Sequence, residues 1–251
     1  MRLPDPKFPM DTMNKADGLE LLRGIPDSYC KMIIFDPQYR EVLDQLKYGN
    51  EGDRQKGRFI LPQMSDLVIT DFGREIARIL VPSGYCALWA DKMILCQGIA
   101  PRFFNGQLQI VDLITWDKQT FGMGYRSRRR AEHLIVLQNP PIKARATWRS
   151  MPSIPDVWPE KITNKIHVHQ KPFDLQKAII EVTTDPGDVV IDPVAGSFSV
   201  MTCAHACGRR FLGGDILGAP QSADALQNMA APSIEPDLQD LIGQDAKGEK
   251  A

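Results

Sequence analysis

The chain lacks the features of membrane and secreted proteins. None of its apolar runs approaches the length of a membrane span, and residues 1–6 contain no apolar core of the kind found in signal peptides. Its five cysteines are an odd number and are scattered over apolar segments, which does not fit a disulfide framework. We therefore expect a cytoplasmic protein whose cysteines are reduced and lie in the core.

Metal ligands are also sparse. Cys203, His205 and Cys207 form a short cluster, but His205 would point away from the helix face that the two cysteines share. No second pair of ligands accompanies them, so we expect no zinc site.

Charge is unevenly distributed, although the net charge is only −1. Residues 117–171 carry eleven lysines and arginines against four acids, whereas residues 221–251 carry six acids and two lysines. A hydrophobic content of 43% over 251 residues is ordinary for a globular protein with a substantial core. The basic middle predicts a polyanionic partner.

A βαβ unit is expected in residues 187–215. The apolar run 188–192 predicts a buried parallel strand that ends in Asp192, and 200–207 has the composition of a short helix. The returning strand ends in Asp215, 23 residues after the first acid. This is close to the spacing at which a carboxylate binds a ribose.

The turn of this unit contains one glycine, Gly196, where a dinucleotide-binding turn would have three. An acid at the end of the first strand would repel phosphate, but it suits the ammonium of an amino-acid-like ligand. The two acids therefore favour S-adenosylmethionine over a nicotinamide cofactor. An ordinary α/β turn without a ligand remains the alternative.

Hydrophobic patterns predict the other elements of an α/β domain. Helices are expected at 17–24, 66–80, 93–104 and 171–182, and strands at 31–35, 85–89, 108–116 and 132–137. No helix fits between the last two strands, so we expect an antiparallel hairpin with a basic tip. The boundaries that we expect are an arm at 1–15, a globular domain at 16–217 with a mobile loop at about 40–65 and an irregular stretch at 139–170, and an acidic, disordered tail at 218–251.

Three short motifs, in this order, resemble the amino-group DNA methyltransferases. They are Asp-Pro-Gln-Tyr at 36–39, His-Gln-Lys-Pro at 169–172 and Asp-Pro-Val-Ala-Gly-Ser at 192–197. Because the catalytic tetrapeptide precedes the cofactor turn, the order resembles the circularly permuted β class, and the resemblance covers about residues 14–216. It implies a Rossmann-like class I methyltransferase sheet with an antiparallel hairpin at one edge. It also implies S-adenosylmethionine as the cofactor and double-stranded DNA as the substrate, and it suggests a homodimer.

The resemblance assigns the chemistry to residues 36–39. The Asp36 carboxylate and the Pro37 carbonyl would accept the two N–H bonds of an exocyclic amine, so that its lone pair can attack the methyl group. Tyr39 would stack on a base flipped from the duplex, and Gln38 stands where the family usually has a second proline. Asp rather than Ser at position 36 favours adenine N6 over cytosine N4. No cysteine follows a proline, which excludes cytosine C5 methylation.

The resemblance also implies contacts to the cofactor, with Asp215 on the ribose and Asp192 at the methionine end. The full set is Asp17, Lys171, Pro172, Phe173, Asp192, Pro193, Ala195, Gly196, Ser197 and Asp215. A helix N-terminal acid is the alternative for Asp17. Phe198 replaces a usual second glycine, so we expect a narrower turn or an aromatic ring near the methionine part.

DNA contacts are expected from the basic middle, with a target-recognition region at about 117–170. They are Arg126, Arg128, Arg129 and Arg130 at the hairpin tip, together with Lys143, Arg145 and Arg149. A solvated hairpin tip is the alternative for the first four.

Other functions stay open. The same acceptor geometry would serve a cytosine-N4, RNA or protein-amide methyltransferase. The substitutions at Gln38 and Phe198 would also allow a non-catalytic DNA-binding subunit. A nicotinamide oxidoreductase is disfavoured by the single-glycine turn.

Overall fold

The computed structural model describes residues 3–39, 64–98, 104, 106–122, 126–163 and 170–219. Its strands are β1 (Asn14–Lys15), β2 (Cys30–Phe35), β3 (Leu80–Ala90), β4 (Gln109–Asp117), β5 (Ala131–Gln138), β6 (Val157–Pro159), β7 (Val189–Asp192) and β8 (Arg210–Asp215). Its helices are α1 (Gly18–Arg23), α3 (Asp66–Ile79), α4 (Lys92–Cys96), α6 (Ala144–Thr147), α7 (Phe173–Thr183) and α8 (Ser199–Ala206).

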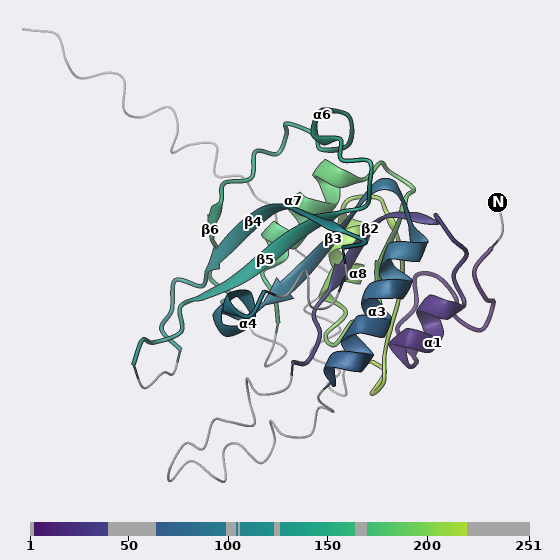
Figure 1. Cartoon of the computed structure of the whole chain (residues 1–251), viewed down its shortest axis with the longest axis horizontal. Helices are drawn as coiled ribbons and strands as arrows, with labels where there is room; N and C mark the ends of the chain where they lie inside the picture. The colour runs from purple at the N-terminus through teal and green to yellow at the C-terminus, as the bar shows by residue number, and fades with distance from the viewer. Residues whose placement is uncertain are drawn as a thin grey trace, which may run out of the picture.

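The described strands form one sheet of eight, in the order β1-β8-β7-β2-β3-β5-β4-β6 (Figure 1). Pairing is parallel from β1 to β3 and antiparallel between β3 and β5 and between β5 and β4. The sequence predicted this arrangement, an α/β sheet with an antiparallel hairpin at one edge.

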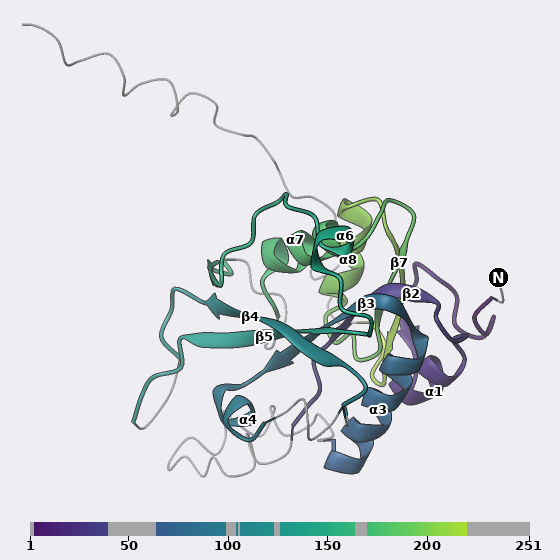
Figure 2. The same cartoon turned by 45° about the horizontal axis from the view of Figure 1, so that its top comes forward.

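Helices cover both faces of the parallel half, as Figure 2 shows for α1 and α3 on one side and α7 and α8 on the other. Successive side chains of a strand point to opposite faces. On β2, Ile33 and Phe35 therefore join the core under α1 and α3, whereas Met32 and Ile34 join the core under α7 and α8. Burial on both faces explains why β2 and β7 read as continuous apolar runs.

Two of the expected elements differ from the structure. The helix predicted at 93–104 is not continuous, because α4 ends at Cys96 and Gly98 adopts a positive φ of 73°. The stretch 139–170, predicted to be irregular, contains α6 and also β6, which pairs in parallel with β4 and extends the sheet. The elements α4, α6 and β6 are each too short to give a periodic hydrophobic signal in the sequence.

The N-terminal segment is not an arm. Phe8 is buried, Asn14 and Lys15 pair with the end of β8, and Asp11 forms an ion pair with Arg210 and a hydrogen bond with His205. The packed domain therefore begins before residue 16. These contacts link positions nearly 200 residues apart, which no local pattern reveals.

Residues 40–63 of the expected mobile loop, His169 of the second motif and residues 220–251 of the expected tail lie outside the described residues. At the loop's end, Ser65 caps α3 by accepting a hydrogen bond from the Val68 N–H at 3.3 Å. Cys30, Cys86, Cys203 and Cys207 are buried and free, as predicted, whereas Cys96 is exposed.

Candidate active site

The two Asp-Pro sequences lie side by side. β2 and β7 are parallel neighbours in the register Met32↔Val190 and Ile33↔Ile191, so Asp36 and Asp192 emerge at the same edge of the sheet. β3 continues the sheet beyond β2, and β8 continues it in the other direction beyond β7. This change of direction is the topological switch point, where open α/β sheets bind their ligands.

Asp36 belongs to a cluster of alternating charges. Its Oδ2 atom lies 3.1 Å from Lys171 Nζ, which lies 2.8 Å from Glu132 Oε2. The other oxygen of Glu132 accepts a hydrogen bond from Lys118. The two ammonium groups also lie over indole rings, Lys171 at 5.0 Å from the Trp89 centroid and Lys118 at 5.2 Å from the Trp116 centroid.

The surroundings shift the pKa values in this cluster in different directions. Burial raises the pKa of Asp36 and Glu132 raises it further, while Lys171 opposes both. Burial would also raise the pKa of Glu132, but Lys171 and Lys118 lower it to about 2. Burial would lower the pKa of Lys171, but the two carboxylates hold it above its ordinary value.

Asp192 has no such cation. The residue is 5% exposed, and its side chain accepts a hydrogen bond from the Val194 N–H at 3.1 Å. Burial, with smaller contributions from the charges of Asp36 and Asp215, raises the pKa of Asp192 to about 8. A buried carboxyl group surrounded by other acids fits the ammonium group of an amino-acid-like ligand, which would supply the missing positive charge.

The turn after β7 is tightly packed. The Gly196 N–H donates to Asp215 Oδ2 at 3.1 Å, and Asp215 Oδ1 accepts from the Leu217 N–H at 2.8 Å, so Asp215 braces the turn that the sequence analysis assigned to the cofactor. Gly18 approaches it closely, because a Cβ atom there would lie 2.2 Å from the Pro193 carbonyl oxygen. Ala195 and Ser197 of this turn are buried.

Phe198 does not face this turn's ligand side. It adopts a left-handed conformation, with a φ of 58°, and its fully buried ring packs edge-on against Phe211 at 6.2 Å. The expectation of an aromatic ring beside the methionine part is therefore wrong. The side chain fills the core beneath β8, and only its backbone has the conformation that a glycine would favour.

The remaining expected cofactor residues lie around the same edge. Asp17 is exposed and caps α1 by accepting from the Glu20 N–H at 3.0 Å, which agrees with the alternative of a helix N-terminal acid. It adjoins β1, whose Lys15 pairs with Asp215. Pro172 is the N-cap of α7, and Phe173 packs against the core under α7 and α8.

Tyr39 is not available for stacking in this conformation. Its ring is 8% exposed, and its hydroxyl donates to the Trp89 carbonyl at 3.0 Å. The neighbouring Gln38 carbonyl accepts from the Met64 N–H at 2.8 Å, so the end of the tetrapeptide is anchored to the start of α3. Stacking of Tyr39 on a flipped base would require the ring to leave this position.

The hairpin tip lies at the Asp36 edge, but most of its arginines are engaged within the protein. Arg130 forms two hydrogen bonds with Asp117, Arg129 lies 3.7 Å from Asp91, and Arg128 donates to carbonyls of the tip. Phe121 is 61% exposed and lies under the guanidinium groups of Arg128 and Arg130. Among the described residues, Arg126 is exposed and forms no ion pair.

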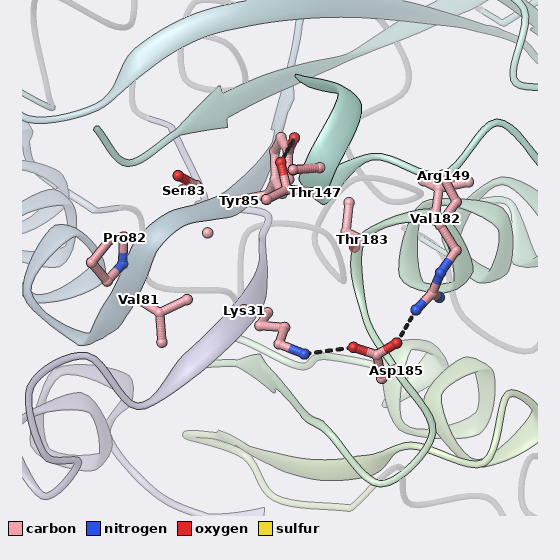
Figure 3. A pocket seen from close by; sticks show the side chains of 12 residues that line it. Lys31, Val81, Pro82, Ser83, Tyr85, Thr147, Arg149, Val182, Thr183 and Asp185 are labelled. Atoms are coloured by element: carbon pink, nitrogen blue, oxygen red, sulfur yellow. Dashed lines mark hydrogen bonds and ion pairs between the residues drawn. The ribbon is translucent and has the colours of Figure 1, made fainter. Parts of the chain in front are cut away.

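The other expected DNA contacts lie at the opposite end of the sheet. Arg145 lies in α6, and Lys143 and Arg149 lie on either side of it; Figures 1 and 2 show α6 away from the hairpin tip. Arg149 donates to the Glu181 and Thr184 carbonyls and to Asp185, so it caps the C-terminus of α7. Figure 3 shows this side chain in a cavity of about 160 Å³ between α7 and the start of β3. The structure does not bring these three residues to Asp36.

Sequence reasoning missed three members of the site. Glu132 and Trp89 stood in segments read as strands and Lys118 just after one, and their contacts with Lys171 or with each other depend on long-range packing. Trp89 Nε1 is the one buried side-chain nitrogen or oxygen in the described chain without a hydrogen-bond partner. An unpartnered buried donor beside Asp36 fits a site that a ligand completes.

Comparison with known proteins identifies the fold and the family. A family model described as DNA methylase (N6_N4_Mtase) matches residues 30–218. The type II methyltransferase M.HhaII of Haemophilus parahaemolyticus is 48% identical over 206 residues, which cover 81% of this chain and 90% of that protein. Two solved structures share the fold, each with a TM-score of 0.60. They are the M1.HpyAVI–SAM complex, at 18% identity over 87% of this chain and 97% of that one, and the cytosine-N4-specific PvuII DNA methyltransferase, at 15% identity over 88% and 86%.

The sheet and the acidic switch point thus define a class I S-adenosylmethionine-dependent methyltransferase. Within that class, the chain belongs to the DNA methylase family, which contains both adenine-N6 and cytosine-N4 enzymes. Its cofactor is S-adenosylmethionine, as the sequence predicts. No helix in the described part of the chain is long and apolar enough to cross a membrane.

Proposed function

We propose that this chain transfers a methyl group from S-adenosylmethionine to the N6 amine of adenine in double-stranded DNA. The observation that carries the proposal is the position of Asp36 at the switch point, with Oδ2 bonded to Lys171. Within the described chain, Oδ1 of Asp36 takes no hydrogen bond or ion pair, and the side chain is 28% exposed. This oxygen can accept an N–H bond from a substrate.

The chemistry follows from the acceptor. The lone pair of an exocyclic amine is delocalised into the base, and hydrogen bonds from the amine to the Asp36 carboxylate and the Pro37 carbonyl localise it. When bound, S-adenosylmethionine supplies an electrophilic methyl group. The amine nitrogen forms the new N–C bond as the S–C bond breaks with its electron pair left on sulfur, and the surplus amine proton is lost to solvent.

The division of binding roles is part of the proposal. Asp192 would hold the ammonium group of the cofactor and Asp215 its ribose, with the turn at 195–197 and with Asp17, Pro172, Pro193 and Phe173 around them. Arg126 and the exposed ring of Phe121 support DNA binding at the hairpin tip, on the same edge as Asp36.

Adenine is favoured because position 36 is Asp rather than Ser, which the motif resemblance associates with N6. The relationship to M.HhaII further supports a type II modification methyltransferase. A homodimer remains a prediction. The exposed apolar side chains of Ile110, Leu113 and Val157 near the hairpin edge support it, and sedimentation equilibrium tests it.

Nucleoside mass spectrometry tests the reaction. Unmethylated plasmid DNA is incubated with S-adenosylmethionine and the wild type, Asp36→Ala, or the surface control Asp71→Ala. We expect N6-methyladenine with the wild type and control but none with Asp36→Ala. N4-methylcytosine would overturn the base assignment, and methylation only of RNA or protein, or cofactor binding without turnover, would favour the other functions.

A further inference from the structure

Lys171 is engaged within the protein. Its side chain is 14% exposed, and its ammonium group lies 3.1 Å from Asp36 Oδ2, 2.8 Å from Glu132 Oε2 and 5.0 Å from the centroid of the Trp89 ring. An ammonium group has three N–H bonds, and the two carboxylates accept from it at two of them. The contact between Lys171 and the cofactor that the sequence suggested would compete with these interactions.

We propose that Lys171 is a positioning residue for methyl transfer, and that Glu132 anchors it. Lys171 holds the Asp36 carboxylate ionised and fixes Oδ2, which leaves Oδ1 to accept the N–H of the target amine. The inference rests on the proposed role of Asp36 but not on which amine is methylated.

Glu132 explains how Lys171 keeps its position. Glu132 binds Lys171 through one oxygen and Lys118 through the other, so both oxygens of its carboxylate are held in place. The Trp89 ring supports the ammonium group from a further direction. Fixed in this way, Lys171 can orient Asp36 before substrate arrives, which lowers the reorganisation needed in the transition state.

The charges around Asp36 define the effect of Lys171. Glu132 on β5 disfavours ionisation of Asp36, and Lys118 next to β4 favours it. On β7, it is the charge of Asp36 that helps to raise the pKa of Asp192. Tyr39 stays neutral, because burial raises its pKa well above the ordinary value. Lys171 is therefore the main group that lowers the pKa of Asp36 against the effect of burial.

The pKa values of Glu132 and Lys171 argue against a proton relay through the cluster. A relay would pass through a neutral Lys171 and a protonated Glu132. Glu132 has a pKa of about 2 and the pKa of Lys171 is raised, so that state is strongly disfavoured. The cluster acts as a fixed set of charges.

The test compares Lys171→Met, Lys171→Arg and Glu132→Gln with Lys177→Met, a matched control on α7 whose lysine faces Glu181. Total transfer of a radiolabelled methyl group to DNA is measured against pH, so the result does not depend on the methylated base. Calorimetry gives the Kd for S-adenosylmethionine. Thermal melting confirms that each variant folds.

We expect Lys171→Met to lower kcat about a hundredfold, with the cofactor Kd changed by less than about threefold. Without the ammonium group, the pKa of Asp36 rises, so the acidic limb of the pH–rate profile should move up by about one pH unit or more. Lys171→Arg should restore part of the activity and of the profile, Glu132→Gln should be intermediate, and Lys177→Met should match the wild type.

A weakened cofactor Kd with unchanged kcat at saturation would overturn the proposal and make Lys171 a cofactor contact. An unshifted acidic limb would overturn it as well. If the wild type transfers no methyl group to DNA, the proposed function fails, and Lys171 is still tested by carbon-13 NMR titration of the Asp36 carboxyl. An equal Asp36 pKa in the wild type and Lys171→Met would then refute the inference.

Discussion

Asp36 and Asp192 end neighbouring parallel strands, and each is followed by proline, yet their surroundings are opposite. Asp36 is 28% exposed and paired with Lys171, whereas Asp192 is 5% exposed and has only acids as charged neighbours. In the function that we propose, the protein's own cation keeps the first carboxylate ready for a neutral amine. The second would take a cation from the cofactor, so that one sequence motif would serve two ligands of different charge.

The largest effect is expected for Asp36→Ala. Loss of the acceptor should lower kcat about a thousandfold, because the lone pair of the amine is no longer localised. Cofactor affinity, measured by calorimetry, should stay within about threefold of the wild type. If cofactor binding fell together with turnover, Asp36 and Asp192 would not have separate roles, and the contrast between them would be contradicted.

Asp192→Asn should give the reverse pattern. Loss of the buried negative charge should weaken S-adenosylmethionine binding about tenfold to a hundredfold. The methyl-transfer rate at saturating cofactor should change much less. Asp188→Asn, at the other end of the same strand and paired with Lys31, is the matched control and should bind the cofactor normally.

Substitutions at Phe198 should affect stability rather than the acceptor. Phe198→Gly removes the strain of a positive φ but leaves a cavity against Phe211, with a net loss of about 2–4 kcal/mol in the free energy of unfolding. Phe198→Ala keeps the strain and should be less stable by about 1 kcal/mol more. Denaturant titration measures both, and a Phe198→Gly variant as stable as the wild type would contradict the packing seen here.

The smallest effect is expected at the opposite end of the sheet. Arg149→Gln removes bonds to the C-terminus of α7 and should cost about 1 kcal/mol of stability while leaving DNA affinity unchanged. Arg126→Gln at the hairpin tip should instead weaken DNA binding and reduce the slope of log affinity against log salt by about one. DNA titrations over a salt series distinguish the two ends, and equal losses would place both arginines on DNA.

The parts of the fold that were predictable have strong local signals. Continuous apolar runs that end in Asp-Pro identified β2 and β7, and the lack of space for a helix identified the β4–β5 hairpin. The site followed because the carboxyl ends of neighbouring parallel strands lie at one edge. Asp36 and Asp192 could therefore be placed together from the sequence alone.

What could not be predicted depends on long-range packing. Lys171 directly precedes α7, and only the docking of that helix against the hairpin brings its ammonium group to Asp36 and Glu132. In the sequence, Arg149 looked like part of a basic surface. In the structure, the main chain has returned to the amino-terminal ends of the parallel strands at this residue, and Arg149 caps the C-terminus of α7. The composition of a segment gives the charge of its side chains but not the direction in which they point.

In the proposed function, Asp192 meets the positive charge of the cofactor. Its pKa of about 8 means that it is protonated at pH 7 in the free protein, and binding an ammonium group favours the ionised form. Affinity should therefore rise with pH up to about 7.5, above which the α-amino group of the cofactor, with a pKa of about 8, itself begins to lose its proton. Calorimetry of S-adenosylmethionine binding at pH 7, in two buffers of different ionisation enthalpy, should show release of nearly one proton with the wild type and none with Asp192→Asn. Binding of the wild type without proton release would contradict the account.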